Sequence, residues 1–210
     1  MPSLAARLLA LLLVALAAPL HAQEGPFPAL YDVSGVAADD VLNVRAGPSA
    51  GAERIGALAP DARGVEVTAT DAAGGWGQVN AGERAGWVSM RFLARRPGQG
   101  RDALPLPMRC FGTEPFWSLS VSEGGLRLQG PGVPRPVTTS LAARTRAAGR
   151  LDAYGLVGWG AGGGRAIHGT VRRASCNDGM SDRRYGLAAD LLVQDGEALR
   201  QYAGCCSLAR

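Results

Sequence analysis

The stretch Leu42–Leu93 decides the fold, because it divides into short runs in which apolar and polar residues alternate. Leu42 and Val44 fall on one face of the first run and Asn43 and Arg45 on the other, as in a half-buried β-strand. Glycine, proline and aspartate separate the runs and are typical of turns. The stretch therefore predicts short antiparallel strands; the runs are LNVRAGPS (42–49), RIGAL (54–58), GVEV (64–67), GGWGQV (74–79), AGWVS (85–89) and FL (92–93).

Several short strands within about 50 residues are typical of a small closed or partly closed barrel. The order of these runs resembles the bacterial SH3 (SH3b) domain over residues 32–94. The resemblance implies a non-catalytic binding module of the bacterial envelope, with cell-wall peptides or other proteins as usual partners. Aromatic and arginine side chains favour binding surfaces, so the candidate ligand-binding residues are Tyr31, Asn43, Arg45, Trp76, Trp87 and Arg91.

Each of these candidates also has a structural interpretation. A domain of about 60 residues has little core, so Trp76 or Trp87 could supply it instead of a binding platform. Asn43 and Arg45 could tie down the turn at 47–48 rather than contact a ligand. Both interpretations stay open at the level of sequence.

The segment at residues 1–22 predicts a secretory signal peptide. Arg7 supplies its positive end, an apolar run of about eleven residues follows, and Ala22 precedes the expected cleavage site. That run is shorter than the roughly 20 residues that a membrane-spanning helix needs. We therefore expect a periplasmic or secreted protein without a membrane span.

Residues 95–109 have the composition of a linker, which either stays exposed or packs along a neighbouring domain. A second domain is predicted over 110–207, mostly antiparallel β, as a small barrel or sandwich. Trp117, Leu119 and Val121 share one face of its first strand. The run 187–193 is assigned to a strand that ends at the hairpin signal Asp195-Gly196, whereas 141–148 fits either a helix or a strand. The chain is thus expected to be all-β.

All four cysteines lie in this second domain, and in an exported chain disulfides are the default. Three pairings are possible. Cys205 and Cys206 are neighbours, about 3.8 Å apart at Cα, which is below the separation of an unstrained bridge. Each is therefore expected to pair with Cys110 or Cys176.

Two motifs of the second domain, C-x-G-T-E-P-F-W at 110–117 and C-N-D-G-M-S-D at 176–182, together with Gly204-Cys205, are similar to a family of small exported bacterial proteins. Many members are lipoproteins, and the family has no established activity. The resemblance implies the disulfides Cys176–Cys205 and Cys110–Cys206.

The carboxylates and hydroxyls of these motifs are the remaining candidates for a site. Asp178, Ser181 and Asp182 form an oxygen-rich turn that could bind a cation, a sugar or a peptide, or could fasten its own backbone. Glu114 either fastens a loop or acts as a lone functional acid, and Trp117 belongs to the same motif.

Other chemistry is disfavoured by composition and spacing. The formal charge is +4 and every basic residue is arginine, but the arginines are scattered and no nucleic-acid-binding motif accompanies them. No Cys or His spacing predicts a metal site, and no nucleophile motif accompanies His168. We therefore expect no cofactor, no metal and no catalysis.

The predicted function is an exported envelope adaptor that binds cell-wall peptides or an envelope protein. The alternatives are an inhibitor of a wall-degrading enzyme such as lysozyme and an enzyme of unrecognised type.

Overall fold

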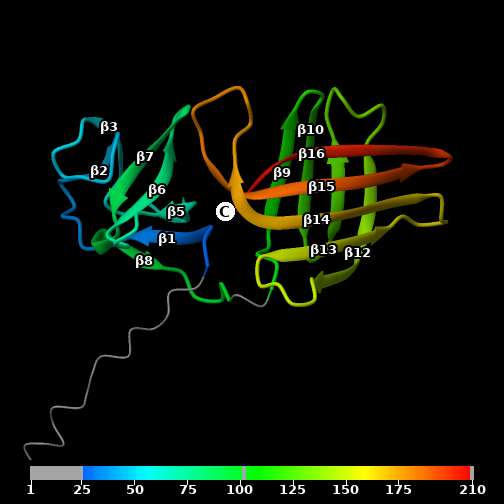
Figure 1. The fold of residues 1–210 in the computed structure, drawn as a ribbon, viewed down its shortest axis with the longest axis horizontal. Helices are drawn as coiled ribbons and strands as arrows, with labels where there is room; N and C mark the ends of the chain where they lie inside the picture. Colours follow the sequence, from blue (N-terminus) through cyan, green and yellow to red (C-terminus); the bar gives the residue numbers. More distant parts are fainter. Residues whose placement is uncertain (1–25, 101–102, 209–210) are drawn as a thin grey trace, which may run out of the picture.

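The computed structural model describes residues 26–100 and 103–208, and nearly all of its regular structure is β. Two β units lie side by side, the N-terminal one on the left of Figure 1 and the C-terminal one on the right. The predicted signal peptide at 1–22 lies outside the described residues. The all-β prediction is confirmed.

The N-terminal unit consists of two small antiparallel sheets, ordered β4-β1-β8 and β3-β2-β7-β6-β5. The alternating side chains meet in one core, in which Leu42 is 4 % and Val44 0 % exposed. The elements are β1 (Ala29–Val33), β2 (Leu42–Arg45), β3 (Arg54–Leu58), β4 (Val65–Val67), β5 (Ala69–Thr70), β6 (Trp76–Ala81), β7 (Arg84–Ser89), the 3-10 turn η1 (Met90–Phe92) and β8 (Leu93–Arg95).

The C-terminal unit is a closed eight-stranded barrel in the order β10-β11-β12-β13-β14-β15-β16-β9. Of the two predicted alternatives, a barrel and a sandwich, the barrel is the one observed. Closure removes both sheet edges. The strands are β9 (Met108–Thr113), β10 (Phe116–Ser122), β11 (Gly125–Gln129), β12 (Val137–Arg146), β13 (Ala153–Trp159), β14 (Arg165–Cys176), β15 (Tyr185–Asp195) and β16 (Ala198–Leu208).

Side-chain alternation fills this barrel as the sequence predicted. Trp117, Leu119 and Val121 of β10 point inward and are at most 4 % exposed. The open question at 141–148 is settled in favour of a strand, since β12 runs through Arg146 with an irregularity between Leu141 and Ala143. Residues 187–193 belong to β15, which turns into β16 after Asp195.

The two disulfides lie on opposite faces of the barrel wall, because adjacent residues of a strand point to opposite sides. Cys110–Cys206 joins directly paired residues of β9 and β16 within the core. Cys176–Cys205 joins the end of β14 to β16 on the outer face. These are the pairs that the family resemblance implies.

The connection between the units packs against both of them. Gln99 exchanges hydrogen bonds with the backbone of Leu30: its Nε2 donates to the carbonyl at 2.8 Å, and its Oε1 accepts from the N–H at 2.6 Å. Leu104 is 4 % exposed and joins the barrel core. Of the two alternatives for this linker, packing along its neighbours is the one observed.

Candidate functional site

A groove of about 440 Å³ crosses the N-terminal unit between β2 and η1; we call it the β2–η1 groove. Its walls combine aromatic, amide, guanidinium and carboxylate groups, which is the usual make-up of a small binding site. Four of the six ligand-binding candidates line it. The lining side chains include Asp40, Asn43, Arg45, Trp76, Arg91 and Phe92.

Asn43 contributes an unsatisfied acceptor to this groove. Its Oδ1 is shielded from solvent and accepts no hydrogen bond from the residues that the structure describes. A shielded polar atom without a partner costs about 1–3 kcal/mol, so a site that leaves one in place needs an explanation. A ligand N–H that enters the groove would satisfy it.

The two arginines of the groove have different surroundings. Arg45 Nη1 donates to the carbonyl of Ala52 at 2.7 Å and so ties down the loop that follows β2. The guanidinium of Arg91 stacks over the ring of Phe92, with 4.3 Å between its Cζ and the ring centroid. Arg91 therefore remains the cation better able to meet a ligand.

Tyr31 and Trp87 do not line the groove. Tyr31 is 1 % exposed, and its hydroxyl accepts a hydrogen bond from Arg95 Nη1 at 3.1 Å, so its prediction as a ligand contact is wrong. The reason is that β1 begins at Ala29, before the predicted domain, and places Tyr31 on its inward face. Trp87 is half-buried opposite Arg45 and Gln78 on the sheet.

A second and larger groove, of about 890 Å³, lies on the barrel along β9 and β10; we call it the β9–β10 groove. Trp117 and Asp178 from the two sequence motifs line it, together with Tyr185. Glu114 lies exposed in the preceding turn, and its side chain makes no hydrogen bond or ion pair within the described part of the chain. The structure therefore brings together only part of the candidate set.

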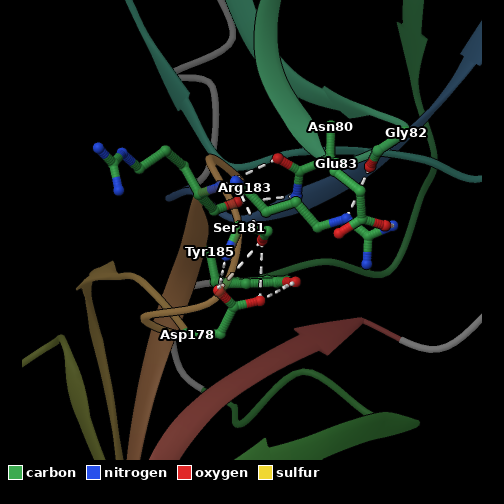
Figure 2. Close-up of polar contacts among 8 residues, drawn as sticks. Asn80, Gly82, Glu83, Asp178, Ser181, Arg183 and Tyr185 are labelled. Atoms are coloured by element: carbon green, nitrogen blue, oxygen red, sulfur yellow. Dashed lines mark hydrogen bonds and ion pairs between the residues drawn. The ribbon is translucent and has the colours of Figure 1, made fainter. Parts of the chain in front are cut away.

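Asp178 organises the loop between β14 and β15. Its Oδ1 accepts hydrogen bonds from the N–H groups of Met180 at 3.0 Å and Ser181 at 2.9 Å. Its Oδ2 accepts from Ser181 Oγ at 3.0 Å and Tyr185 Oη at 3.3 Å (Figure 2). Burial raises the pKa of this carboxyl, but these hydrogen bonds outweigh it and hold the pKa below its ordinary value. Burial also raises the pKa of Tyr185. The contacts are those of a carboxylate that fastens its own turn.

The same loop docks on the β6–β7 hairpin of the N-terminal unit, and it is the orange loop that rises between the units in Figure 1. The N–H of Asp182 donates to the carbonyl of Glu83 at 3.0 Å, and the N–H of Ala85 donates to the carbonyl of Asp182 at 3.1 Å. Arg183 Nε donates to the carbonyl of Gly82 at 2.7 Å, and its Nη2 contacts the carboxylate of Glu83 at 2.7 Å (Figure 2). Asp182, a candidate site residue, thus acts here through its backbone.

Asn80 completes this docking contact. Its Nδ2 donates to the carbonyl of Arg184 at 2.9 Å, and its Oδ1 accepts from the N–H of Arg184 at 3.0 Å. Sequence reasoning missed Asn80, Glu83 and Arg183, because no local pattern links residues about a hundred positions apart.

Two further contacts join the units. Arg173 Nη1 donates to the carbonyls of Phe27 at 2.9 Å and Pro28 at 3.2 Å. Glu66 accepts from Ser207 Oγ at 2.6 Å and from the N–H of Leu208 at 3.1 Å. The two units are therefore held in one relative orientation by hydrogen bonds at three separate places.

Residues 26–100 and 103–208 contain neither a cluster of metal-ligating side chains nor a helix that could span a membrane. No group of three or more His, Cys, Asp or Glu side chains there is arranged to hold a metal ion. His168 packs edge-on against Trp159, with ring centroids 4.7 Å apart. None of the helical segments in the described ranges has the length and hydropathy of a bilayer span.

Comparison with known proteins bears on the N-terminal unit. Residues 40–94 match the family described as "Bacterial SH3 domain". No curated protein matches the chain, and neither does any solved structure. The family resemblance of the C-terminal motifs stays a prediction. A bacterial SH3 domain suggests a role in binding the cell wall or a protein, and with the sheets and groove described above, residues 40–94 are identified as such a domain.

Proposed function

We propose that this protein is an exported, non-enzymatic envelope adaptor whose β2–η1 groove binds an extended peptide, either a peptidoglycan stem peptide or a segment of an envelope protein. The SH3 match supports a binding role, and the two disulfides are consistent with export, because such bonds persist in oxidising compartments.

The observation that carries this proposal is the unsatisfied Oδ1 of Asn43 in a groove that also contains Trp76 and Arg91. A peptide presents a backbone N–H at every residue except proline, so it supplies the missing donor. Trp76 offers an apolar surface to the peptide side chains, and Arg91 offers a charge-assisted donor to a carbonyl or carboxylate. A volume of about 440 Å³ accommodates a few residues rather than a folded partner.

A holding role rather than catalysis is also supported by the polar groups of the C-terminal motif. The carboxylate of Asp178 is engaged by the N–H groups of Met180 and Ser181, and the hydroxyl of Ser181 is directed at the same carboxylate. A carboxylate whose oxygens accept hydrogen bonds from the N–H and O–H groups of its own turn stabilises that turn.

A sedimentation assay on insoluble peptidoglycan tests the proposal. The full chain is expected in the pellet, whereas Trp76→Ala and Asn43→Ala shift it to the supernatant. Trp159→Ala is the matched control, because Trp159 is 53 % exposed on the barrel, outside the β2–η1 groove.

Two outcomes of this assay count against parts of the proposal. A wild-type protein found wholly in the supernatant excludes the cell wall as ligand and leaves the envelope protein. Sedimentation that Trp76→Ala and Asn43→Ala do not weaken places binding outside this groove and overturns the proposal.

A further inference from the structure

The pairing register of β9 and β10 fixes the order of the side chains on the floor of the β9–β10 groove. Cys110 and Leu119 point into the barrel, so their neighbours on β9 and β10 point outward. Arg109 is paired with Ser120, Phe111 with Ser118, and Thr113 with Phe116. Successive outward rows of a strand are about 7 Å apart. The outer face therefore begins with a cation and continues into an aromatic surface.

Arg109 is the free charge of this face. Its side chain is exposed, and within residues 26–100 and 103–208 its guanidinium forms no hydrogen bond, ion pair or ring contact. The nearby carboxylate of Glu66 is occupied by Ser207 and Leu208. The carboxylate of Asp178, on the opposite wall, is occupied by donors of its own loop. An incoming anion would therefore meet Arg109 as an available partner.

The aromatic part of the floor is open to solvent. Phe116 is 50 % exposed, and it lines the groove with Phe111 and Pro131. Phe111 is held in place by an edge-on contact with Tyr185, with ring centroids 4.9 Å apart. An exposed aromatic side chain beside a rigid one offers a favourable surface to an apolar ligand group.

One wall of the groove is the docked loop, which contributes Asp178 and Arg183. The loop is anchored at its base by Cys176–Cys205, at its middle by Thr113 Oγ1, which donates to the carbonyl of Asp178 at 2.8 Å, and at its tip by the β6–β7 hairpin. A wall fixed at three points loses little conformational freedom when a ligand binds, and this favours affinity.

We propose that the β9–β10 groove is a second binding site, which takes the C-terminal residue of a peptide. The terminal carboxylate would pair with Arg109, and an apolar terminal side chain would lie on Phe111 and Phe116. A C-terminal residue carries both groups on one Cα, so it spans the row spacing of about 7 Å between Arg109 and Phe111, and a large apolar side chain extends from Phe111 toward Phe116 in the following row. A single unpaired arginine can pair with a carboxylate through two parallel N–H···O hydrogen bonds.

Titration of the full ¹⁵N-labelled chain with two synthetic peptides tests this proposal. The probes are N-acetyl-Gly-Gly-Phe as the free acid and the same peptide as the C-terminal amide. The free acid is expected to shift the amide resonances of Arg109, Phe111 and Ser118 and to bind at least about tenfold more tightly than the amide, which lacks the charge. Trp76→Ala, which alters the β2–η1 groove, should leave this titration unchanged.

Two pairs of variants complete the test. Arg109→Gln should abolish the preference for the acid, and Phe116→Ser should weaken both peptides by about tenfold. Arg200→Gln and Leu199→Ser are the matched controls, since both residues are exposed on the barrel and neither lines the groove. Equal affinity for acid and amide, shifts confined to the β2–η1 groove, or no shift at millimolar peptide would each overturn the proposal.

Discussion

Asp182 and Arg84 form a parallel β-bridge that joins the barrel to the β6–β7 hairpin of the SH3 domain. The bridge is extended by the side chain of Arg183, which reaches Gly82 and Glu83 on the same hairpin. The loop at 177–184, which carries most of the motif at 176–182, therefore fixes the two domains relative to one another. Four expected outcomes follow from this arrangement and from the barrel that supports it.

Arg183→Ala should loosen the contact between the domains. It removes a hydrogen bond to a backbone carbonyl and an ion pair with Glu83, together worth about 1–2 kcal/mol. Amide hydrogen exchange of Ala85 and Asp182 is therefore expected to accelerate by about tenfold. Arg184→Ala is the matched control, because the exposed side chain of Arg184 makes no contact of this kind in the described structure. Equal exchange in the two variants would contradict the docking role.

Replacing Cys176 and Cys205 together by alanine should destabilise the barrel by about 3–4 kcal/mol, because the bridge closes a loop with a sequence separation of 29. Denaturant unfolding, monitored by tryptophan fluorescence, measures this loss. Limited proteolysis should in addition cleave within 177–184, since the base of that loop is released. A variant that unfolds at the wild-type midpoint would show that the anchor contributes nothing to the stability of the barrel.

The carboxylate of Asp178 should stabilise the protein in a pH-dependent way. Its pKa in the folded state lies below the ordinary value of 3.8, so its contribution is complete above pH 3.8 and is lost as the pH falls from there through the folded-state pKa. The difference in unfolding free energy between wild type and Asp178→Asn should therefore be largest near neutral pH and shrink on acidification below 3.8. Glu197→Gln, which removes an exposed carboxylate without a hydrogen-bond partner in the described residues, is the control. A difference that grows on acidification would refute the assignment.

Gly204→Ala should destabilise the barrel by at least about 1–3 kcal/mol. A Cβ at this position would lie 2.0 Å from the carbonyl oxygen of Phe111 and 3.0 Å from the ring of Trp117, and a strand backbone cannot move away without breaking the ladder. Gly124→Ala is the comparison, because its Cβ would meet its nearest neighbour, Ser122 Oγ, at an ordinary 3.7 Å. Thermal unfolding should give a lower melting temperature for Gly204→Ala than for Gly124→Ala. Similar melting temperatures would contradict the close approach of the strands.

Much of the fold could be predicted from short-range sequence patterns. The alternation in 42–45 and 117–121 predicted the inward residues correctly, because a β-strand has a period of two residues. The hairpin at 195–196 was predicted from its turn dipeptide. The strand at 141–146 stayed ambiguous because only its tertiary partner, β13, decides between helix and strand there.

The residues of the candidate sites were harder to predict from the sequence. Asn43, Trp76 and Arg91 were predicted as ligand contacts from residue type, and they do line one groove. Tyr31 has the same chemical character but lies in the core, because side-chain type does not reveal the face of a strand whose start is misplaced. Arg109 and Phe116 were not predicted as site residues, although Phe116 belongs to the motif at 110–117, since their joint placement depends on the register of β9 and β10.

The sequence by itself determined two β units, their alternating cores and a disulfide-linked second unit, because turn residues, two-residue periodicity and cysteine usage act over short distances along the chain. Only the tertiary structure decided which polar groups face a groove and how the units are joined. Those features depend on backbone hydrogen bonds between residues such as Glu83 and Asp182, which are far apart in the chain and meet only in the tertiary structure.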